Sequence, residues 1–570
     1  MTEVRKSERV INNLPVLIFV LIASFVQCKK PSTSQPPPPS PTTSSSFDIV
    51  TRTVNSISFN STQTLYGINN SPVIQVSFSD KVDRTTVSSA VSYTNKTQSS
   101  ANVPYTILYQ NNDSSLVISP STNINYFNEY IFSINTLLKS VSGKTLSGRV
   151  DLDFITQIDP SDKFPQISDS ALLDLAQQQT FKYFWDFAHP VSGLARERNT
   201  SGDVVTSGGS GFGIMAIVAG IQRGFITRAQ GLARMQTIVS FLKNTAQKFK
   251  GAFPHWLNGA NGNVVPFSTN DNGADLVETS YLMMGLLSAR QYFNGSDITE
   301  TSLRDDINSV WNGVDWDWFR QGKKVLYWHW SADKGFIMNM PIQGWNETLI
   351  TYVLAASSTT HGITKPVYDS GFAKNGAIKN GNTYYSYQLP LGEALGGPLF
   401  FEHYSFMGIN PKNLTDQYAN YQTQTVNHTK INYEYCKANP KGWYGYSDQC
   451  WGLTASDIPN GYTASSPTND VGIIAPTAAL SSFAYTPTES MKALKFFYYK
   501  LGDKLWGQYG FYDAFRLQDG WFASSYLAID EGPIVVMIEN YRTSLLWNLF
   551  MSCSEVKTGM QNLGFQSPYL

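Results

Sequence analysis

The sequence predicts a mainly α protein in which a small all-β sandwich precedes a larger α/α toroid. Between residues 47 and 158, short alternating runs are separated by Asn, Asp, Ser and Gly turns, which predicts a sandwich of about seven strands. After residue 160 the apolar spacing becomes helical. Several of these helices are apolar on most sides, which favours two concentric layers of helices whose loops gather around a cleft at one end.

The composition argues against a nucleic-acid-binding protein. Charged residues make up only 15% of the 570 residues, and the net charge is −1, whereas binding to phosphates needs a basic surface. Aromatic residues make up 14%. Few charges and many rings suit a neutral ligand that stacks on aromatic side chains, such as a carbohydrate.

The N-terminus has the pattern of an export signal. Three basic residues precede an apolar run over residues 14–26, which is short for a membrane span. Cys28 follows, and residues 28–46 form a Pro/Ser/Thr-rich tether. The arrangement resembles a bacterial lipoprotein signal over residues 1–27, with Cys28 lipidated and the chain held at the outer membrane, facing the periplasm or the cell surface. An ordinary signal peptide or an uncleaved anchor is the alternative, because Gln27 precedes the cysteine where a small residue is usual.

The β region carries no cluster of acids, histidines or cysteines that points to chemistry. Strand-like runs lie at residues 73–78, 105–109 and 116–118. The segments PVIQVSFSDKVD and NDSSLVISPSTNINYFNEYIFSI resemble the bacterial Ig-like domain of the SbsA type. We expect residues 47–158 to form a spacer that lifts the next domain from the membrane, with carbohydrate binding as the alternative.

The helical region begins at Ser168, a typical N-cap residue. A buried helix is expected over residues 211–223, and Thr227 with Gln230 forms a capping box for the next one. Further helices are expected over residues 274–293, 302–320, 346–359, 414–437, 471–484, 487–501 and 533–551.

Three groups of acids are candidates for catalysis. Asp271, Asp275 and Glu278 surround one expected helix start, where they could equally complement the helix dipole. Carboxylates at the mouth of a barrel are also what glycoside hydrolysis requires, one as acid and one as base.

Glu347 is a single acid beside Trp345, ahead of an apolar helix. Apolar surroundings keep a carboxyl group protonated, as a general acid needs, although Glu347 could instead cap its helix. Asp530 and Glu531 stand just before another apolar helix, where capping is again the alternative.

Aromatic residues in polar loops between these acids are candidate sugar platforms. They are Trp256, Trp330, His403, Tyr404, Trp443, Tyr444 and Trp451. A disulfide between Cys436 and Cys450 would close a loop of about 15 residues and contribute about 3 kcal/mol. No CxxC pair or HExxH motif occurs, so no metal site is predicted.

Several sequence segments, which occur in a fixed order, resemble the glycoamylase-like domain. That domain includes glycoside hydrolase family 144, the endo-β-1,2-glucanases. The segments include SGGSGFGIMAIVAGIQRGFITRAQG, GADLVETSYLMMGLLSARQYF, WNETLITYVLAASS and YLAIDEGPIVVMIENYRTSLLW. The resemblance covers about residues 165–553. It implies an (α/α)6 barrel, no metal or cofactor, and hydrolysis by carboxylates with inversion of configuration.

Position by position, the acidic residues of the resembled family correspond to the acids of the three groups above. We expect Glu347 to be the general acid. Asp275, Glu278 or Asp530 could be the base, and the remaining acids would bind sugar hydroxyls. An inverting pair stands about 6.5–9.5 Å apart to admit a water, although a proton relay through a substrate hydroxyl would relax that spacing.

The sequence therefore predicts a monomeric hydrolase of β-linked glucan, most directly an endo-β-1,2-glucanase. An exo-acting β-glucosidase and a non-catalytic glycan-binding lipoprotein are the alternatives.

Overall fold

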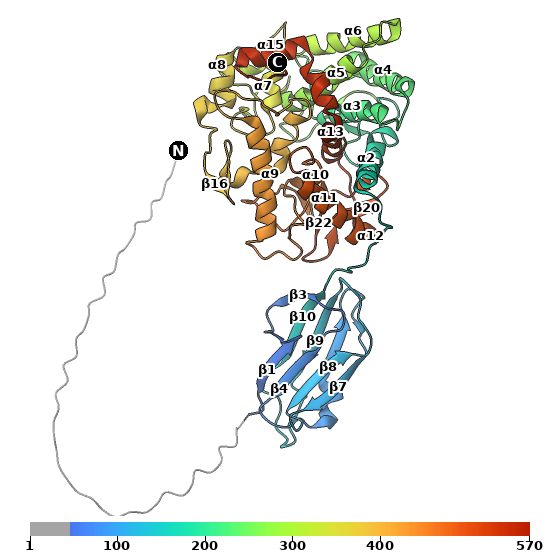
Figure 1. Cartoon of the computed structure of the whole chain (residues 1–570), viewed down its shortest axis with the longest axis vertical. Coiled ribbons are helices and arrows are strands. Elements are labelled where there is room, and N and C mark those ends of the chain that lie inside the picture. Colours follow the sequence, from blue (N-terminus) through green and yellow to red (C-terminus); the bar gives the residue numbers. More distant parts are fainter. Residues whose placement is uncertain (1–45) are drawn as a thin grey trace, which may run out of the picture.

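The computed structural model describes residues 46–570 of the chain. The expected signal, the lipidation site Cys28 and the tether up to residue 45 lie outside the described residues. A β sandwich lies at one end of the molecule and a larger helical domain at the other (Figure 1). Among the described residues, no helix combines the length and apolarity that crossing a membrane requires.

The sandwich consists of two five-stranded sheets within residues 46–158, so it has more strands than the seven expected, several of them only two residues long. One sheet has the order β2-β1-β4-β8-β7 and the other β3-β10-β9-β5-β6. Alternate residues of β4 (Ile74–Phe78) are buried between the sheets. The strand bounds are β1 Ile49–Val54, β2 Ile57–Ser58, β3 Thr64–Ile68, β5 Val91–Asn95, β6 Ala101–Asn102, β7 Tyr105–Gln110, β8 Ser115–Pro120, β9 Glu129–Ile134 and β10 Val150–Thr156.

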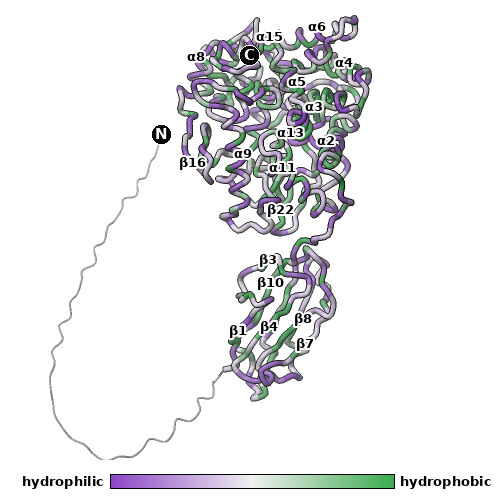
Figure 2. Tube along the Cα trace, viewed as in Figure 1, coloured by the Kyte–Doolittle hydropathy of each residue, from purple (hydrophilic) through white to green (hydrophobic). Residues whose placement is uncertain are grey.

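The helical domain has inner helices that are buried almost all round and outer helices that cover them. The inner helices are α3 Ser207–Gln222, α5 Leu276–Tyr292, α7 Leu349–Ser357, α10 Pro476–Leu480 and α13 Ala528–Thr543. Helix α3 packs between α5 and α13, α7 packs on α5, and α10 packs on α13. The apolar segments of these helices lie in the interior of the domain (Figure 2).

The outer helices include α2 Asp169–Trp185, α4 Arg228–Asn244, α6 Ile298–Asn312, α9 Tyr421–Ala438, α11 Pro487–Lys495 and α15 Ser554–Leu563. Two helix starts are confirmed. Ser168 Oγ accepts a hydrogen bond from the Ala171 N–H at 3.2 Å, and Thr227 forms the expected capping box with Gln230.

Several expected boundaries are wrong. The segment 414–420 precedes α9 and is not helical, because Asn420 caps the helix there. The stretch 302–320 divides into α6 and a 3-10 helix over Trp316–Arg320, which Asp315 caps. The helix expected from residue 533 begins at Ala528, so its two acids lie in its first turn, and Ser544 in a left-handed conformation ends it before α14 (Leu545–Met551). Helix α15, which was not expected, packs on α7.

Helices α3 and α5 approach each other closely because glycines face each other across the contact. A Cβ atom at Gly285 would lie 2.2 Å from the carbonyl oxygen of Gly211, and a Cβ atom at Gly211 would lie 2.1 Å from the carbonyl oxygen of Tyr281. These distances leave no room for a methyl group, so the spacing of the two helices depends on both glycines.

The two domains contact each other through aromatic side chains. Tyr66 of the sandwich stacks on Tyr444 with ring centroids 5.4 Å apart, and Phe127 meets Phe522 edge to face at 6.3 Å. The β3 end of the sandwich faces the part of the helical domain that carries β22 (Phe515–Arg516) (Figure 1). The sandwich is therefore packed against the helical domain and not only tethered to it.

Candidate active site

Three inner helices begin at one cavity of about 460 Å³. Thr206 precedes α3, Glu278 lies in the first turn of α5, and Leu527 precedes α13; all three line the cavity. Other lining residues are Glu197, Arg198, His255, Trp256, Phe267, Phe400, Tyr404, Tyr462 and Ile529. Helix N-termini concentrate unpaired N–H groups and positive potential, so the cavity favours carboxylates at its wall.

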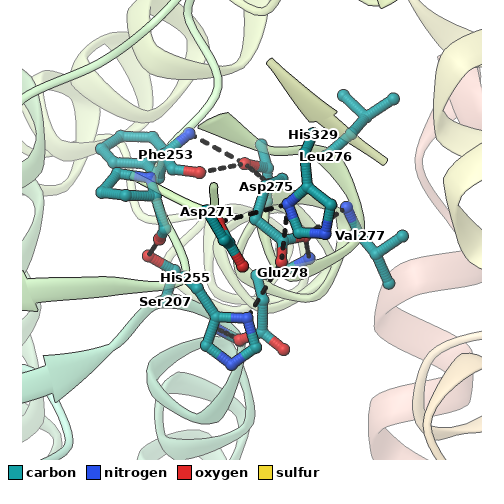
Figure 3. A network of polar contacts seen from close by, with 12 residues as sticks. Ser207, Phe253, His255, Asp271, Asp275, Leu276, Val277, Glu278 and His329 are labelled. Atoms are coloured by element: carbon teal, nitrogen blue, oxygen red, sulfur yellow. Dashed lines mark hydrogen bonds and ion pairs between the residues drawn. The ribbon is translucent and has the colours of Figure 1, made fainter. Parts of the chain in front are cut away.

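Asp275 is completely buried at the start of α5 and both of its carboxylate oxygens are engaged. Its Oδ1 accepts hydrogen bonds from the N–H groups of Val277 and Glu278, at 3.0 and 2.9 Å. Its Oδ2 accepts a hydrogen bond from His255 Nδ1 at 2.9 Å (Figure 3). Burial alone would raise the pKa of Asp275, but the hydrogen bond from His255 and the nearby imidazoles lower it below its ordinary value.

Two histidines hold the acids of this wall in place. Besides His255, His329 Nδ1 lies 3.2 Å from Asp271 Oδ1 and 4.0 Å from Asp275 Oδ2. Burial works against the charged form of His255, but the charges of Glu278, Asp275 and Asp271 raise its pKa to about 9. The pKa of His329 is likewise raised by Asp271 and Asp275 against the effect of burial. Imidazolium groups therefore balance the negative charge around Asp275.

Glu278 is one turn further along α5 and reaches the cavity. Its Oε2 accepts hydrogen bonds from the Gly208 N–H at 2.7 Å and from Thr206 Oγ1 at 3.3 Å, at the start of α3. Burial raises the pKa of Glu278 above its ordinary value, and the charge of His255 opposes that effect.

Glu347 lies two residues before α7, whose N-cap residue is Thr348. It is not among the residues that line the cavity, but the charges of Glu278 and Asp275 act on its carboxyl group. Its carbonyl oxygen accepts hydrogen bonds from Ser405 Oγ and, at 3.5 Å, from the Tyr281 hydroxyl, which fixes the backbone there. Burial raises the pKa of the Glu347 carboxyl to about 7, and the charges of Glu278 and Asp275 add to the effect. Such a carboxyl group can carry a proton near neutral pH.

Asp530 and Glu531 lie in the first turn of α13, and both are buried. Burial raises the pKa of Asp530 well above its ordinary value, and the carboxyl group of Asp513 raises it further. Asp513 has a pKa of about 7 because it is buried and close to Asp457. Burial also raises the pKa of Glu531. The raised pKa values favour the protonated forms of Asp530 and Glu531, neither of which is among the residues that line the cavity.

Three of these side chains could hold a metal ion by their spacing. The candidate ligand atoms of His255, Asp271 and Asp275 lie within 4.8 Å of one another. His255 Nδ1 and Asp275 Oδ2 already share a hydrogen bond. The arrangement as it stands is one of ion pairs between acids and imidazoles.

Of the expected aromatic platforms, Trp256 and Tyr404 line the cavity. Trp330 is close by, since its strand β15 (His329–Trp330) pairs with β14 (Ala274–Asp275), but it is not among the lining residues. His403 is buried behind the cavity, where its Nε2 faces Ser482 Oγ at 3.0 Å and burial lowers its pKa to about 3.

The other three expected platforms lie elsewhere, which corrects the expectation. Trp451 is 0% exposed and donates from Nε1 to the carbonyl oxygen of Glu489 at 3.2 Å. Trp443 donates from Nε1 to Asp470 Oδ2 at 3.0 Å. Tyr444 packs against Tyr66 at the domain contact. These three side chains contribute to packing and to the domain contact, because each already makes a hydrogen bond or a ring contact within the protein.

The possible disulfide between Cys436 and Cys450 is not formed, since both thiols are free and buried. Burial raises the pKa of each thiol, so each is held in its neutral form.

Several residues of the site were not singled out from the sequence. His255 and His329 are two of them, and each pairs with an acid of the first group. Glu197 and Arg198 were missed, because acids and arginines in loops are common and only the fold brings these two to the cavity wall. Asp513 was missed as well, and only the fold brings it close to Asp530.

Comparison with known proteins shows which families the two domains match. Residues 339–554 match the family described as "Putative glucoamylase", and residues 48–156 match the family described as "Bacterial Ig-like domain". The chain is 48% identical over 421 residues to the exo β-1,2-glucooligosaccharide sophorohydrolase (non-reducing end) of Parabacteroides distasonis. That match covers 70% of this chain and 58% of the relative, so this chain matches little more than half of the relative's length.

Two solved structures are also similar. The endo-β-1,2-glucanase of Chitinophaga pinensis, in complex with sophorotriose and glucose, is 51% identical with a TM-score of 0.70, over 71% of this chain and 100% of that one. A β-1,2-glucanase of Parabacteroides distasonis is 38% identical with a TM-score of 0.68, over 90% of this chain and 73% of that one.

Proposed function

Because the chain belongs to the glycoamylase-like family, whose matched members include bacterial β-1,2-glucan hydrolases, we propose that it hydrolyses β-1,2-glucan at the cavity where α3, α5 and α13 begin. The observation that carries the proposal is that Glu278 lines this cavity and that its charge and the charge of Asp275 both act on Glu347. Burial raises the pKa of Glu347 to about 7, while hydrogen bonds and imidazoles lower that of Asp275. Carboxyl groups whose pKa values are driven apart are the pattern of acid and base in glycoside hydrolysis.

In the proposed mechanism Glu347 is the general acid and donates its proton to the oxygen of the departing sugar. Glu278 is the general base, because it reaches the cavity and can take a proton from the attacking water. The product then has the inverted anomeric configuration.

Asp275 is a positioning residue in this proposal, because its two oxygens are occupied by the α5 N-terminus and by His255. Asp530 is less suited to be the base, because the neighbouring carboxyl group of Asp513 raises its pKa further, whereas the charge of His255 and the N–H of Gly208 favour the ionised form of Glu278. Asp530 also does not line the cavity.

For the mode of attack we propose endo cleavage. Arg198 and Tyr462 line both this cavity and a second, adjoining one, so a chain can continue beyond the site. The sophorohydrolase relative favours exo cleavage as the alternative. We further propose that the two helical layers form an (α/α)6 barrel.

Incubation with linear β-1,2-glucan, other β-glucans and starch, followed by chromatography of the products, tests the activity. A ladder of oligosaccharides from β-1,2-glucan alone is expected. A single disaccharide product would replace endo with exo action, and no product from β-1,2-glucan would overturn the proposal. Optical rotation during the reaction reports whether the released anomer is inverted.

We also propose that the protein is an exported lipoprotein anchored through Cys28. The expected result is incorporation of labelled palmitate into the wild-type chain and none into Cys28→Ser. Equal labelling of both would overturn it.

A further inference from the structure

A second cavity, of about 560 Å³, adjoins the candidate active site. Arg198 and Tyr462 belong to the walls of both cavities, so the two are continuous along these side chains. Tyr462 is 48% exposed and stands on β19 (Gly461–Ala464), which pairs with β18 (Ala455–Ile458). Trp521 and Ser525 also line the second cavity. None of the proposed catalytic acids lies in this cavity.

Arg198 is fixed at the junction between two carboxylates. Its Nε donates to Glu197 Oε2 at 2.9 Å, and its Nη1 donates to Asp457 Oδ2 at 3.2 Å. Asp457 is held in turn by the Ser525 hydroxyl at 2.5 Å and, through its own N–H, by Asp513 at 2.7 Å. A guanidinium group held in this way presents its remaining N–H groups in a fixed direction.

The second cavity combines fixed polar groups with one exposed and one half-buried ring. Arg198 and Asp457 supply donors and acceptors, and Trp521 and Tyr462 supply flat apolar faces. This combination suits a neutral sugar, whose hydroxyl groups need hydrogen-bond partners and whose C–H face packs on a ring.

The Trp521 wall is supported by the Ig-like domain. Trp521 and Phe522 form β23, which pairs with β22 (Phe515–Arg516). Phe127 of the sandwich meets the ring of Phe522 edge to face, and its ring lies 3.8 Å from the position of a Cβ atom at Gly520.

The second aromatic contact between the domains leads to the same hairpin. Tyr444, which stacks on Tyr66 of the sandwich, donates its N–H to Gln518 Oε1 at 2.9 Å. Gln518 lies in the turn between β22 and β23. Both contacts therefore hold one side of the second cavity.

We propose that the second cavity is a further glucan-binding site, which takes sugar residues of the chain beyond the linkage being cleaved, and that the Ig-like domain holds its Trp521 wall in position. The sandwich is then part of substrate binding and not a spacer alone. The inference rests on the proposed function, because it names the ligand as the chain that enters the candidate active site.

The test compares the full chain with Trp521→Ala on long β-1,2-glucan and on an oligosaccharide of about five residues. We expect kcat/KM on the long chain to fall about tenfold, mainly through KM, and kcat/KM on the short substrate to change less than twofold. Tyr569→Ala is the matched control, because Tyr569 is 38% exposed and lines neither cavity. An equal loss on both substrates, or no loss on either, would overturn the proposal.

The domain contact is tested by Phe127→Ala and Tyr66→Ala in the full chain. Each is expected to raise KM on the long chain about threefold or more with kcat unchanged, while the melting temperature of the helical domain stays as in the wild type. Unchanged KM in both variants would reject the supporting role of the Ig-like domain.

Binding of long β-1,2-glucan to Glu347→Gln, measured by calorimetry with and without Trp521→Ala, separates this inference from the proposed function. If the wild type hydrolyses no β-1,2-glucan but Trp521→Ala still weakens binding about tenfold, the site is supported and the hydrolysis is rejected. If hydrolysis occurs but Trp521→Ala leaves binding unchanged, the site is rejected alone.

Discussion

His255 donates a hydrogen bond from Nδ1 to Oδ2 of Asp275 at 2.9 Å, while Oδ1 of the same carboxylate caps α5. One buried carboxylate thus joins the start of an inner helix to the cavity wall. Its negative charge contributes to the raised pKa of Glu347, so the acid that anchors the helix also helps to keep a second acid protonated.

Glu347→Gln is expected to reduce the rate of β-1,2-glucan hydrolysis about 10²- to 10⁴-fold, because glutamine keeps the shape of the side chain but has no proton to donate. Release of reducing sugar at neutral pH measures the effect. The matched control is Glu434→Gln on the outer helix α9, which removes a carboxylate paired with Lys437 and should retain full activity. Wild-type rates for Glu347→Gln would show that another group supplies the proton.

The pH dependence of kcat/KM follows from the two pKa directions. Glu347 must be protonated to act as the acid, so activity should fall about tenfold per unit as the pH rises above its pKa of about 7. Glu278 must be ionised to act as the base, and because its pKa is raised, activity should begin to fall on the acid side at a pH above the ordinary glutamate value of 4.5. A profile of kcat/KM between pH 4 and 10 on one glucan measures both limbs. If the residual activity of Glu347→Gln fell in the same way above pH 7, the alkaline loss of activity would belong to another group.

His255 is expected to make folding stability depend on pH. Its pKa is raised from 6.5 to about 9 in the folded protein, so its stabilisation is complete below pH 6.5 and is lost as the pH rises through about 9. A shift of that size corresponds to about 3 kcal/mol of unfolding free energy. Urea unfolding at pH 6 and pH 9.5 measures it, as the difference between the wild type and His255→Asn.

His255→Asn keeps a donor for Asp275 but removes the charge, so the difference between the two pH values should shrink in this variant. His361→Asn is the control, since His361 is 43% exposed and pairs only with Asp315 at 3.4 Å. An equal pH dependence in the wild type and in His255→Asn would show that other groups carry it.

Sequence patterns predicted the parts of the molecule that depend on local spacing. The capping box at Thr227 and the N-cap at Ser168 are confirmed, because a cap depends on neighbours three residues away. The acids at the start of α5 also interact with the acid before α7, because the charges of Glu278 and Asp275 raise the pKa of Glu347.

The aromatic platforms were predicted less well, because exposure of a ring depends on contacts far along the chain. Tyr444 is covered by Tyr66, which is 378 positions earlier in another domain, and Trp451 donates a hydrogen bond to the carbonyl oxygen of Glu489 in the first turn of α11. Neither partner can be inferred from the loops that carry these rings. For the same reason the pairing of Asp513 with Asp530 was not visible in the sequence.

Gly285→Ala is expected to lower the unfolding free energy by about 3 kcal/mol or more, because its methyl group would lie 2.2 Å from the Gly211 carbonyl oxygen and backbone atoms there cannot rotate away. The substitution would force α5 away from α3, and with it Asp275 and Glu278 at the start of α5, so activity should fall together with stability. Thermal and urea unfolding of the full chain measure the loss.

Gly313→Ala is the control, because a Cβ atom there has no neighbour closer than 3.4 Å and its backbone is helical, so its effect should stay within about 1 kcal/mol. If Gly285→Ala were as stable as Gly313→Ala, α3 and α5 would be able to separate without cost, and the close contact would not be what positions the acids.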